Sequence, residues 1–487
     1  MTHQGPTAAL SYAVRLPVVG KYLGQLALML ALLTLPPLAV AAGYGEYSLA
    51  LRFVPVIAFL IAAGTPLARL PAPERLQTNE ALTVTALAFV LAPLLMAYPM
   101  MDAGMSFLDG WFEAVSGITT TGLTTLAGVA DKPRGFLFLR AWMQWYGGLG
   151  IVVLSVALLM GHQLATRRLL QATGTENTVA NTRAHARQVL TVYLLLTAAG
   201  VLALLAAGLA PFAAVAQTFA AVSTGGFSTF NDSMAALSVP ARGVLMVLAL
   251  AGAVSLPLYY RSWRNWREPL RDLELRALLL GCLITGGLVT LILHQQSGMP
   301  TGEALMQGLL LGASAQSTTG FAALPVSHLT ADAKAVLLLS MAVGGSVGST
   351  AGGFKLLRLL VFLRLIRYTL TRAAMPAHAV APPRLGGQTL EPDDITRALL
   401  LIVLFAAVVA LSWLPFVAMG YAPIDGLFEV VSATATVGLS AGIAGPHLPA
   451  GLKLVLMADM LFGRLEIVAL LILLFPGTWY GRRTESS

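Results

Sequence analysis

Ten long apolar stretches constrain the fold of this chain more than any other feature. They lie near residues 24–43, 48–66, 80–99, 136–160, 189–209, 241–260, 276–294, 333–369, 397–418 and 452–475. Each is close to, or longer than, the roughly 20 residues with which an α-helix crosses a bilayer. Of the 487 residues, 57% are hydrophobic and 11% are charged, whereas soluble proteins contain about 25% charged residues. We therefore predict an all-α polytopic membrane protein with about ten crossings.

The basic residues predict how the chain is oriented. If the loops alternate between the two sides, the side of the termini holds twenty of the thirty Lys and Arg residues. The opposite side holds six, namely Arg52, Lys132, Arg134, Arg242, Lys334 and Lys453. Because Lys and Arg gather in cytoplasmic loops, we expect both termini in the cytoplasm. The even number of crossings agrees with this.

One basic connector, at residues 261–276, mixes arginines with Trp263 and Trp266, as an RNA-binding segment can. Its position between two apolar stretches favours a cytoplasmic loop at the membrane edge, with the indole rings at the interface. We therefore expect membrane lipid, and no nucleic acid, as its partner.

The sequence offers little for catalysis or for a resident metal. Cys282 is the single cysteine, which excludes an internal disulfide framework and a thiolate metal site. The seven histidines show no pair at helical ligand spacing and no zinc-protease motif. We predict that the chain is not an enzyme.

A short motif recurs four times in connectors on the side opposite the termini. Residues 109–123 (DGWFEAVSGITTTGL) and 425–439 (DGLFEVVSATATVGL) are identical at nine of fifteen positions. Residues 217–227 and 311–321 share only the ending of this motif, Thr-x-Gly followed by Leu or Phe. Each copy begins with a moderately apolar stretch too short to cross the membrane. Non-helical backbone at membrane depth requires protein or water around it, so the four segments predict one shared aqueous path.

The repeating unit is an outer helix, a short half-crossing helix, a Thr-x-Gly turn and an inner helix. We predict two N-terminal helices within residues 1–70 and then four pseudo-symmetric units around one central pore. Pore repeat one spans 71–165, repeat two 166–262, repeat three 263–373 and repeat four 374–487. Rings of backbone carbonyls can replace the hydration shell of a cation, and glycine permits the dihedral angles that aim them at one axis. Helix C-termini beside the turns add partial negative charge. The pattern thus favours a cation over an anion.

At these turns the chain resembles the TrkH branch of the superfamily of potassium transporters that also includes the Ktr and HKT membrane subunits. Further similarities are the two extra N-terminal spans and the segments WYGGLG (145–150), GGSVGSTAGGFKLLR (344–358) and GRLEI (463–467). The resemblance covers nearly the whole chain. It implies potassium uptake across the bacterial cytoplasmic (inner) membrane, with K+ as the transported ion and no organic cofactor. It also implies a homodimer that docks on a cytosolic nucleotide-binding regulatory subunit of the TrkA type.

The resemblance further implies which residues form the selectivity filter. Carried over position by position, they are Thr120, Thr121, Gly122, Thr224, Gly225, Gly226, Thr318, Thr319, Gly320, Thr436, Val437 and Gly438. In the family, a serine in place of the first filter glycine accompanies sodium transport. Glycine at position 122 therefore implies a preference for potassium.

Glu113 and Glu429 occupy equivalent positions ahead of the first and fourth turns, where Gln217 and Leu311 stand in the other two repeats. They either hydrogen-bond backbone groups behind the filter or raise the local cation concentration. We favour the structural role.

The eighth apolar stretch contains a segment, GGSVGSTAGG (344–353), that is too rich in glycine to form a stable helix. We predict that it breaks this span into two half-helices. By resemblance it is an intramembrane loop that obstructs the closed pore below the filter. The gating residues are then Gly344, Gly345, Gly348, Gly352, Gly353, Lys355 and Arg464.

Arg464 lies near the middle of the last span, where a charge costs at least about 2.5–3.5 kcal/mol unless it is paired or hydrated. One interpretation is a local pair with Glu466 or Asp459. The other is that Arg464 faces the pore, holds loop carbonyls near 348–352 and forms an electrostatic barrier under the filter.

Two other kinds of transport compete with a potassium pore. A secondary transporter for a small solute predicts inverted repeats and broken helices in corresponding halves. Here the four units share one orientation, and we expect only the eighth span to be interrupted. A symporter that couples potassium to protons or sodium through the same pore stays an alternative.

Overall fold

The computed structural model describes residues 13–71, 77–161, 178–374, 376 and 382–480. All ten predicted spans are helical, and the first two precede the repeats. They are α1 (Leu16–Leu33) with α2 (Leu35–Gly43), and α3 (Tyr47–Ala68). The first crossing is longer than predicted and is interrupted at Thr34, because Pro36 and Pro37 cannot donate backbone hydrogen bonds to the preceding turn. Five of the twenty basic residues counted above to orient the chain, the arginines at 75, 167, 168, 482 and 483, lie outside the described residues.

Four units of outer helix, short helix and inner helix follow. Repeat one contains α4 (Thr78–Met100), α5 (Phe107–Ile118) and α6 (Arg134–Gly161). Repeat two contains α8 (Thr178–Ala206), α9 (Pro211–Val222), α10 (Val239–Ala253) and α11 (Leu256–Arg264). Repeat three contains α13 (Leu273–Ser297), α14 (Thr301–Gln316), α15 (Ala331–Val343) and α16 (Leu356–Ala373). Repeat four contains α17 (Pro392–Ala418), α18 (Pro423–Thr434), α19 (Ala450–Arg464) and α20 (Val468–Leu474).

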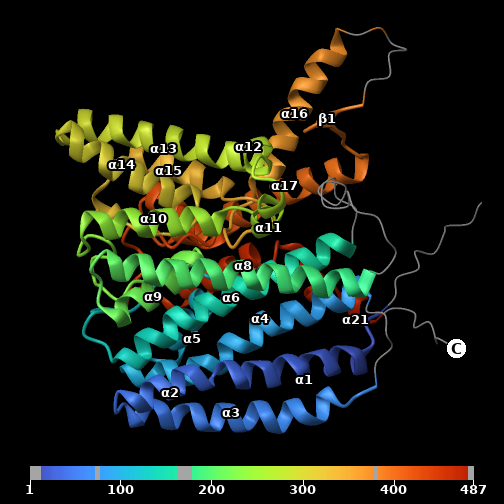
Figure 1. Cartoon of the computed structure of the whole chain (residues 1–487), viewed down its shortest axis with the longest axis vertical. Helices are drawn as coiled ribbons and strands as arrows, with labels where there is room; N and C mark the ends of the chain where they lie inside the picture. Colours follow the sequence, from blue (N-terminus) through green and yellow to red (C-terminus); the bar gives the residue numbers. More distant parts are fainter. Residues whose placement is uncertain (1–12, 72–76, 162–177, 375, 377–381, 481–487) are drawn as a thin grey trace, which may run out of the picture.

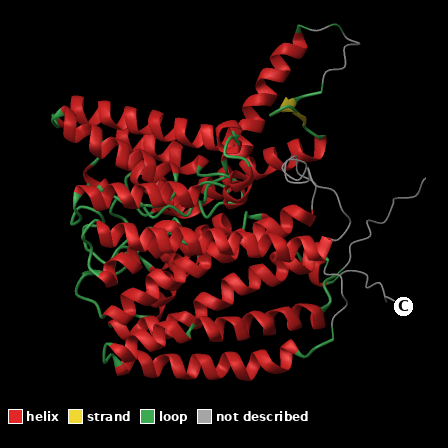
Figure 2. Ribbon diagram, viewed as in Figure 1, coloured by secondary structure: helices red, strands yellow, loops and turns green. Residues whose placement is uncertain are grey.

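Short elements connect these helices. They are α12 (Glu268–Arg271), α21 (Pro476–Trp479), the 3-10 turns Met101–Ala103 and Val326–His328, and a small hairpin of β1 (Arg384–Leu385) and β2 (Gln388–Thr389). Figure 2 shows how completely helix dominates the chain. The prediction of an all-α polytopic membrane fold is confirmed. Among the described residues, six helices are individually long and apolar enough to cross a membrane, and α10 with α11 forms one bent pair.

The long helices run side by side through the molecule, from α3 and α1 along one edge to α13 along the other (Figure 1). The short helices α5, α9 and α14 occupy one half of this bundle, whereas α11, α12 and α21 lie at the opposite end. The N–H of Val14 donates to the carbonyl of Thr478 at 2.9 Å, so the two ends of the described chain lie together. Both ends of the described chain therefore lie at the same end of the helical bundle.

The expectation that only the eighth span is interrupted is wrong. That span is indeed broken between α15 and α16, but α10 and α11 also meet at an angle of 89°. The last span breaks as well, between α19 and α20, where Glu466 and Ile467 both have positive φ angles. Non-glycine residues rarely adopt this conformation, so tertiary contacts hold the break rather than local preference. Three of the four inner helices are thus broken below the turns.

Three inner helices carry a glycine where they cross the carboxyl end of the short helix of their own repeat. A methyl group on any of these glycines would strike a carbonyl oxygen near that end. The pairs are Gly147 with Ile118, Gly252 with Val222, and Gly463 with Thr434. The absence of a side chain therefore sets how closely an inner helix approaches its short helix.

Two lysines connect neighbouring repeats on the side of the turns. Lys453 of α19 pairs with Asp109 in the first turn of α5 at 2.6 Å, and Lys334 of α15 pairs with Asp425 of α18 at 2.7 Å. Both lysine side chains are only 7% exposed. Each carboxylate also faces the positive end of a helix dipole. The two pairs join repeat four to repeat one and repeat three to repeat four.

We predict that Lys453 and Asp109 are energetically coupled. In a double-mutant cycle of Lys453→Met and Asp109→Asn, the double variant should lose less stability than the two single variants together, by about 0.5–3 kcal/mol. Melting temperatures in detergent measure this. Lys132→Met, which removes only a hydrogen bond to the carbonyl of Ala103, is the control. Strict additivity would show that the pair contributes nothing.

Candidate functional site

All four Thr-x-Gly turns share one backbone conformation. The threonine that opens each turn and the glycine that closes it both have positive φ, whereas the residue between them does not. The φ angles are 55° and 90° at Thr120 and Gly122, 51° and 75° at Thr224 and Gly226, 55° and 78° at Thr318 and Gly320, and 49° and 90° at Thr436 and Gly438. The middle residues are Thr121, Gly225, Thr319 and Val437. Alternation of the sign of φ can direct successive carbonyls to the same side of the chain, as a ring of cation ligands requires.

Each turn continues a short helix through the same capping pattern. In repeat one, the N–H of Thr120 donates to the carbonyl of Gly117, and the N–H of Thr121 donates to that of Ser116. The other three repeats make the same pair of bonds at lengths of 2.7–3.2 Å. This is the Schellman pattern, in which glycine normally takes the left-handed position. Threonine is strained in that position. Because the same strained conformation recurs in all four turns, it indicates a functional role.

The four turns form a closed ring. A Cβ atom on the glycine that closes any turn would strike the carbonyl oxygen of the middle residue in the next turn. Gly122 faces Gly225, Gly226 faces Thr319, Gly320 faces Val437, and Gly438 faces Thr121. The turns therefore surround one axis in chain order. Glycine is required at these four positions both for its φ angle and for the closeness of the neighbouring backbone.

The threonine hydroxyls at the base of the ring are not equivalent. Thr120 and Thr436 are at most 1% exposed, and their hydroxyl oxygens have no hydrogen-bond partner among the described residues. The hydroxyl of Thr224 donates to the carbonyl of Ser223, and that of Thr318 accepts from the N–H of Gly352 at 2.7 Å. A buried hydroxyl without a partner costs about 1–3 kcal/mol, so two such oxygens at the ring are consistent with cation ligands.

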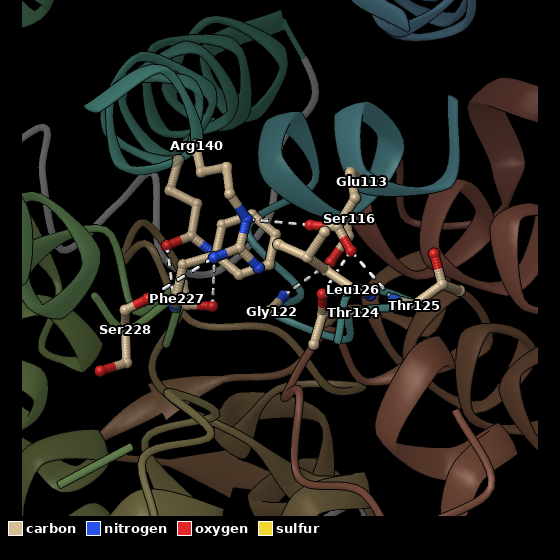
Figure 3. Close-up of polar contacts among 11 residues, drawn as sticks. Glu113, Ser116, Gly122, Thr124, Thr125, Leu126, Arg140, Phe227 and Ser228 are labelled. Carbon is tan, nitrogen blue, oxygen red and sulfur yellow. Dashed lines mark hydrogen bonds and ion pairs between the residues drawn. The ribbon is translucent and has the colours of Figure 1, made fainter. Parts of the chain in front are cut away.

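Buried carboxylates hold the segment that follows the first and fourth turns. Glu113 accepts hydrogen bonds from the hydroxyl of Thr124 and from the N–H of Thr125, at 2.9 Å for the latter (Figure 3). Glu429 accepts from the N–H groups of Ala441 and Ala444, at 2.9 and 2.7 Å. Both side chains are fully buried. Of the two roles considered for these residues, the structure shows the hydrogen bonding to the backbone.

Arg140 is a further buried charge, and the sequence reasoning missed its role. Its guanidinium pairs with Glu113 at 2.9 Å and lies over the ring of Phe227, with Cζ 3.8 Å from the ring centroid. It also contacts the carbonyl of Ser228 at 3.5 Å. Figure 3 shows this guanidinium between Glu113 of repeat one and Phe227 and Ser228 of repeat two. An arginine within an apolar span was the available signal.

The glycine-rich loop 344–355 lies directly below the ring. The hydroxyl of Thr350 donates to the carbonyl of Val222 at 3.0 Å. The N–H of Gly352 reaches the hydroxyl of Thr318, and the N–H of Gly353 donates to the carbonyl of Ala435 at 3.1 Å. The loop thereby contacts repeats two, three and four.

The remaining residues of the predicted gate lie along the same loop. Gly344, Gly348 and Gly353 have positive φ angles of 72°, 75° and 72°. The carbonyl of Gly344 accepts from the side chain of Gln316 at 2.6 Å, and that of Gly345 accepts from the N–H of Leu356 at 3.1 Å.

Two basic side chains donate hydrogen bonds to successive carbonyls of this loop. Nη1 of Arg464 donates to the carbonyl of Thr350 at 2.7 Å, and Nζ of Lys355 donates to that of Ala351. Arg464 also reaches the carbonyl of Gly147 in repeat one at 3.4 Å. The local pairing considered for Arg464 is not observed among the described residues. Glu466 pairs with Arg358 at 2.8 Å instead, and Asp459 accepts from the hydroxyl of Ser412 at 2.6 Å.

Comparison with known proteins agrees with this architecture. The family model "TrkH: Cation transport protein" matches residues 52–476. The chain belongs to the TrkH family. It is 32% identical to the Trk system potassium uptake protein TrkI of Halomonas elongata, over 94% of this chain and 96% of that protein. It is 30% identical to TrkH of Escherichia coli K12, over 83% of this chain and 86% of that protein.

Similarity extends to an archaeal protein and to a solved structure. An uncharacterized cation transporter of Methanocaldococcus jannaschii is 28% identical over 93% of this chain and 94% of its own length. The crystal structure of the potassium transporter TrkH from Vibrio parahaemolyticus superposes with a TM-score of 0.84 at 26% identity. The match covers 96% of this chain and all of that one. The chain is thus a multi-pass membrane protein of a family of cation transport proteins.

We predict that a methyl group on a ring glycine stops transport. Gly226→Ala should lower cation flux by about tenfold or more, since both its φ angle and the carbonyl of Thr319 oppose a side chain. Flux into liposomes containing the purified chain measures this. Gly243→Ala is the matched control, because a Cβ at that helical position meets no atom within 4 Å. Equal flux in the two variants would contradict a tightly closed ring.

Proposed function

We propose that this chain takes up potassium across the bacterial cytoplasmic membrane through the ring of Thr-x-Gly turns. The observation that carries the proposal is the closed ring itself, in which four strained turns place backbone oxygens around one axis. The relatives named as Trk system potassium uptake proteins in E. coli and H. elongata support the choice of ion. In this proposal the filter consists of the twelve residues of the four turns, and both termini lie in the cytoplasm.

In this proposal, oxygen ligands of the filter replace the hydration shell that potassium loses. Carbonyls of the turns, and the unpartnered hydroxyls of Thr120 and Thr436, supply oxygen ligands. The four short helices end at the turns, so each adds roughly half a negative charge at the ring. No rearrangement is needed as the ion enters, because the Schellman bonds and the carboxylates behind the turns already hold the backbone. The glycine at position 122 supports potassium over sodium by family resemblance.

The glycine-rich loop is the gate in this proposal. Its hydrogen bonds to the ends of the short helices support a position of the loop backbone between the ring and the cytoplasmic half of the pore. Arg464 holds the loop there through the carbonyl of Thr350 and brings a positive charge to the conduction path. A cation leaving the filter then meets both a steric and an electrostatic barrier. Opening requires the loop and Arg464 to separate.

In this proposal, partner proteins regulate the opening of the pore. We propose a homodimer in which each subunit has its own pore, and a cytosolic nucleotide-binding subunit of the TrkA type that acts on the gate. The basic segment 261–276, with Trp263 and Trp266 exposed by 60% and 69%, is available on the side of α11 and α12 to such a subunit or to lipid.

Flux measurements in liposomes that contain this chain alone test the proposed function. We predict potassium and rubidium flux driven by their own gradients, with little sodium or chloride flux and no dependence on a proton ionophore. Flux that appears only with a proton or sodium gradient would contradict a simple pore and support coupled symport. No flux even after addition of the cytosolic partner would contradict potassium transport.

We predict that Arg464→Ala raises basal potassium flux, because it frees the carbonyl of Thr350 and removes the charge under the filter. Rubidium uptake by liposomes with equal amounts of folded protein measures this. Arg242→Ala, which removes an arginine bonded to loop carbonyls on the other side of the membrane, should behave like the wild type. Unchanged or lower flux in Arg464→Ala would refute the gating role.

A further inference from the structure

The four filter turns are not supported in the same way. In repeats one and four, a serine of the short helix accepts a hydrogen bond from the N–H of the filter glycine. These bonds are Gly122 to Ser116 at 3.0 Å and Gly438 to Ser432 at 3.1 Å. Repeat three has Ser314 at this position, but its hydroxyl has no hydrogen-bond partner among the described residues, and repeat two has Ala220, so both turns lack this support. The N–H of Gly226 reaches only the carbonyl of Ala220, at 3.4 Å.

In repeat two, a side chain from the neighbouring repeat supports the backbone of the turn instead. Gln144 of α6 is fully buried, and its amide contacts the backbone on both sides of Gly226. Its Nε2 donates to the carbonyl of Gly225 at 2.5 Å, and its Oε1 accepts from the N–H of Phe227 at 3.1 Å. Because the N–H of Phe227 can only donate, the orientation of the amide is determined. Gln144 thus holds one of the four carbonyls that form the ring.

This contact explains an irregularity of the sequence. The middle residue of the turn is threonine or valine in repeats one, three and four, but it is Gly225 in repeat two. Gly225 has no positive φ angle, so its conformation does not require glycine. A Cβ atom at this position would instead strike the side-chain amide of Gln144. Glycine is present at 225 because Gln144 occupies the space that a side chain needs.

The buried charge pair behind the ring shares a neighbour with Gln144, because Arg140 packs over Phe227, whose N–H donates to Gln144. Arg140, one helical turn earlier on α6, also pairs with Glu113. Glu113 in turn accepts the N–H of Thr125, beyond the first turn (Figure 3). The first turn, α6 and the second turn are therefore joined through buried polar contacts that leave little freedom for the amide of Gln144.

We propose that Gln144 is a positioning residue that places the carbonyl of Gly225 in the filter and so contributes to discrimination between cations. The proposal rests on the proposed function, since it assumes that the ring selects the ion. A carbonyl that is free to rotate fits a smaller ion as readily as a larger one, whereas a held carbonyl does not. Loss of Gln144 therefore lowers selectivity more than it lowers flux.

The test compares rubidium and sodium flux in liposomes for the full chain and for Gln144→Met, which keeps the size of the side chain and removes both hydrogen bonds. We expect the rubidium-to-sodium flux ratio to fall by about tenfold, the effect of one ordinary hydrogen bond. Gln307→Met is the control, because it places methionine at another buried glutamine, in the first half of α14. Its flux ratio should equal that of the wild type.

A second variant separates positioning from stability. Ala220→Ser introduces into repeat two the hydroxyl that Ser116 and Ser432 supply elsewhere. In the Gln144→Met background it should restore most of the flux ratio, whereas a purely structural role of Gln144 would show as a lower melting temperature with an unchanged ratio. A wild-type ratio in folded Gln144→Met would overturn the inference and leave the proposed function intact. Absence of cation flux in the wild type, also with its partner, would overturn both.

Discussion

The structure depends on the close approach of four backbone turns to one another around one axis. Each filter glycine lies so close to the carbonyl of the next turn that a methyl group would overlap with it. Such closeness at membrane depth is possible only if protein surrounds the non-helical backbone on every other side. The outer helices, the inner helices with their crossing glycines and the two N-terminal spans supply that enclosure. The large helical bundle is therefore a consequence of what the twelve residues at its centre require.

Burial of the turns has a second consequence. Their backbone N–H and C=O groups, which would be hydrogen-bonded within a helix, need other partners. The chain meets this demand with a polar shell in the protein interior, which includes Glu113, Glu429, Arg140 and Gln144. Their hydrogen bonds go to the backbone beside the turns rather than to the pore. A partly satisfied polar network would be worse than an apolar core. The unpartnered hydroxyls of Thr120 and Thr436 lie at the ring itself, although other buried side-chain atoms, such as the hydroxyl of Thr125, also lack a hydrogen-bond partner among the described residues.

Much of this architecture could be predicted from the sequence because its signals are local. Span length, the recurrent Thr-x-Gly ending and the glycine-rich segment 344–353 each depend on residues that are adjacent in the chain. The break after Ala253 has a local signal in Pro257, at the start of α11, which the prediction did not use. The break at Glu466 has no such signal, since neither Glu466 nor Ile467 favours its positive φ angle. The partners of Arg140 and Gln144 in repeat two lie more than 80 residues away in the chain, across a pseudo-symmetric interface that no local pattern encodes. Sequence reasoning therefore predicted the elements and one contact between repeats, that of Arg464 with the loop, and missed the others.

Those contacts also explain how a fourfold architecture can hold an asymmetric loop, the proposed gate, below the ring. Only repeat three contributes the loop, yet the loop is bonded to Val222 of repeat two, to Thr318 of repeat three and to Ala435 of repeat four. Arg464 adds a link from repeat four to both the loop and Gly147 of repeat one. Each bond ends at the lower edge of the filter or on an inner helix beside it. Movement of the loop must therefore change the surroundings of several turns at once, so the proposed gate and the proposed filter are mechanically one unit despite their separation in the sequence.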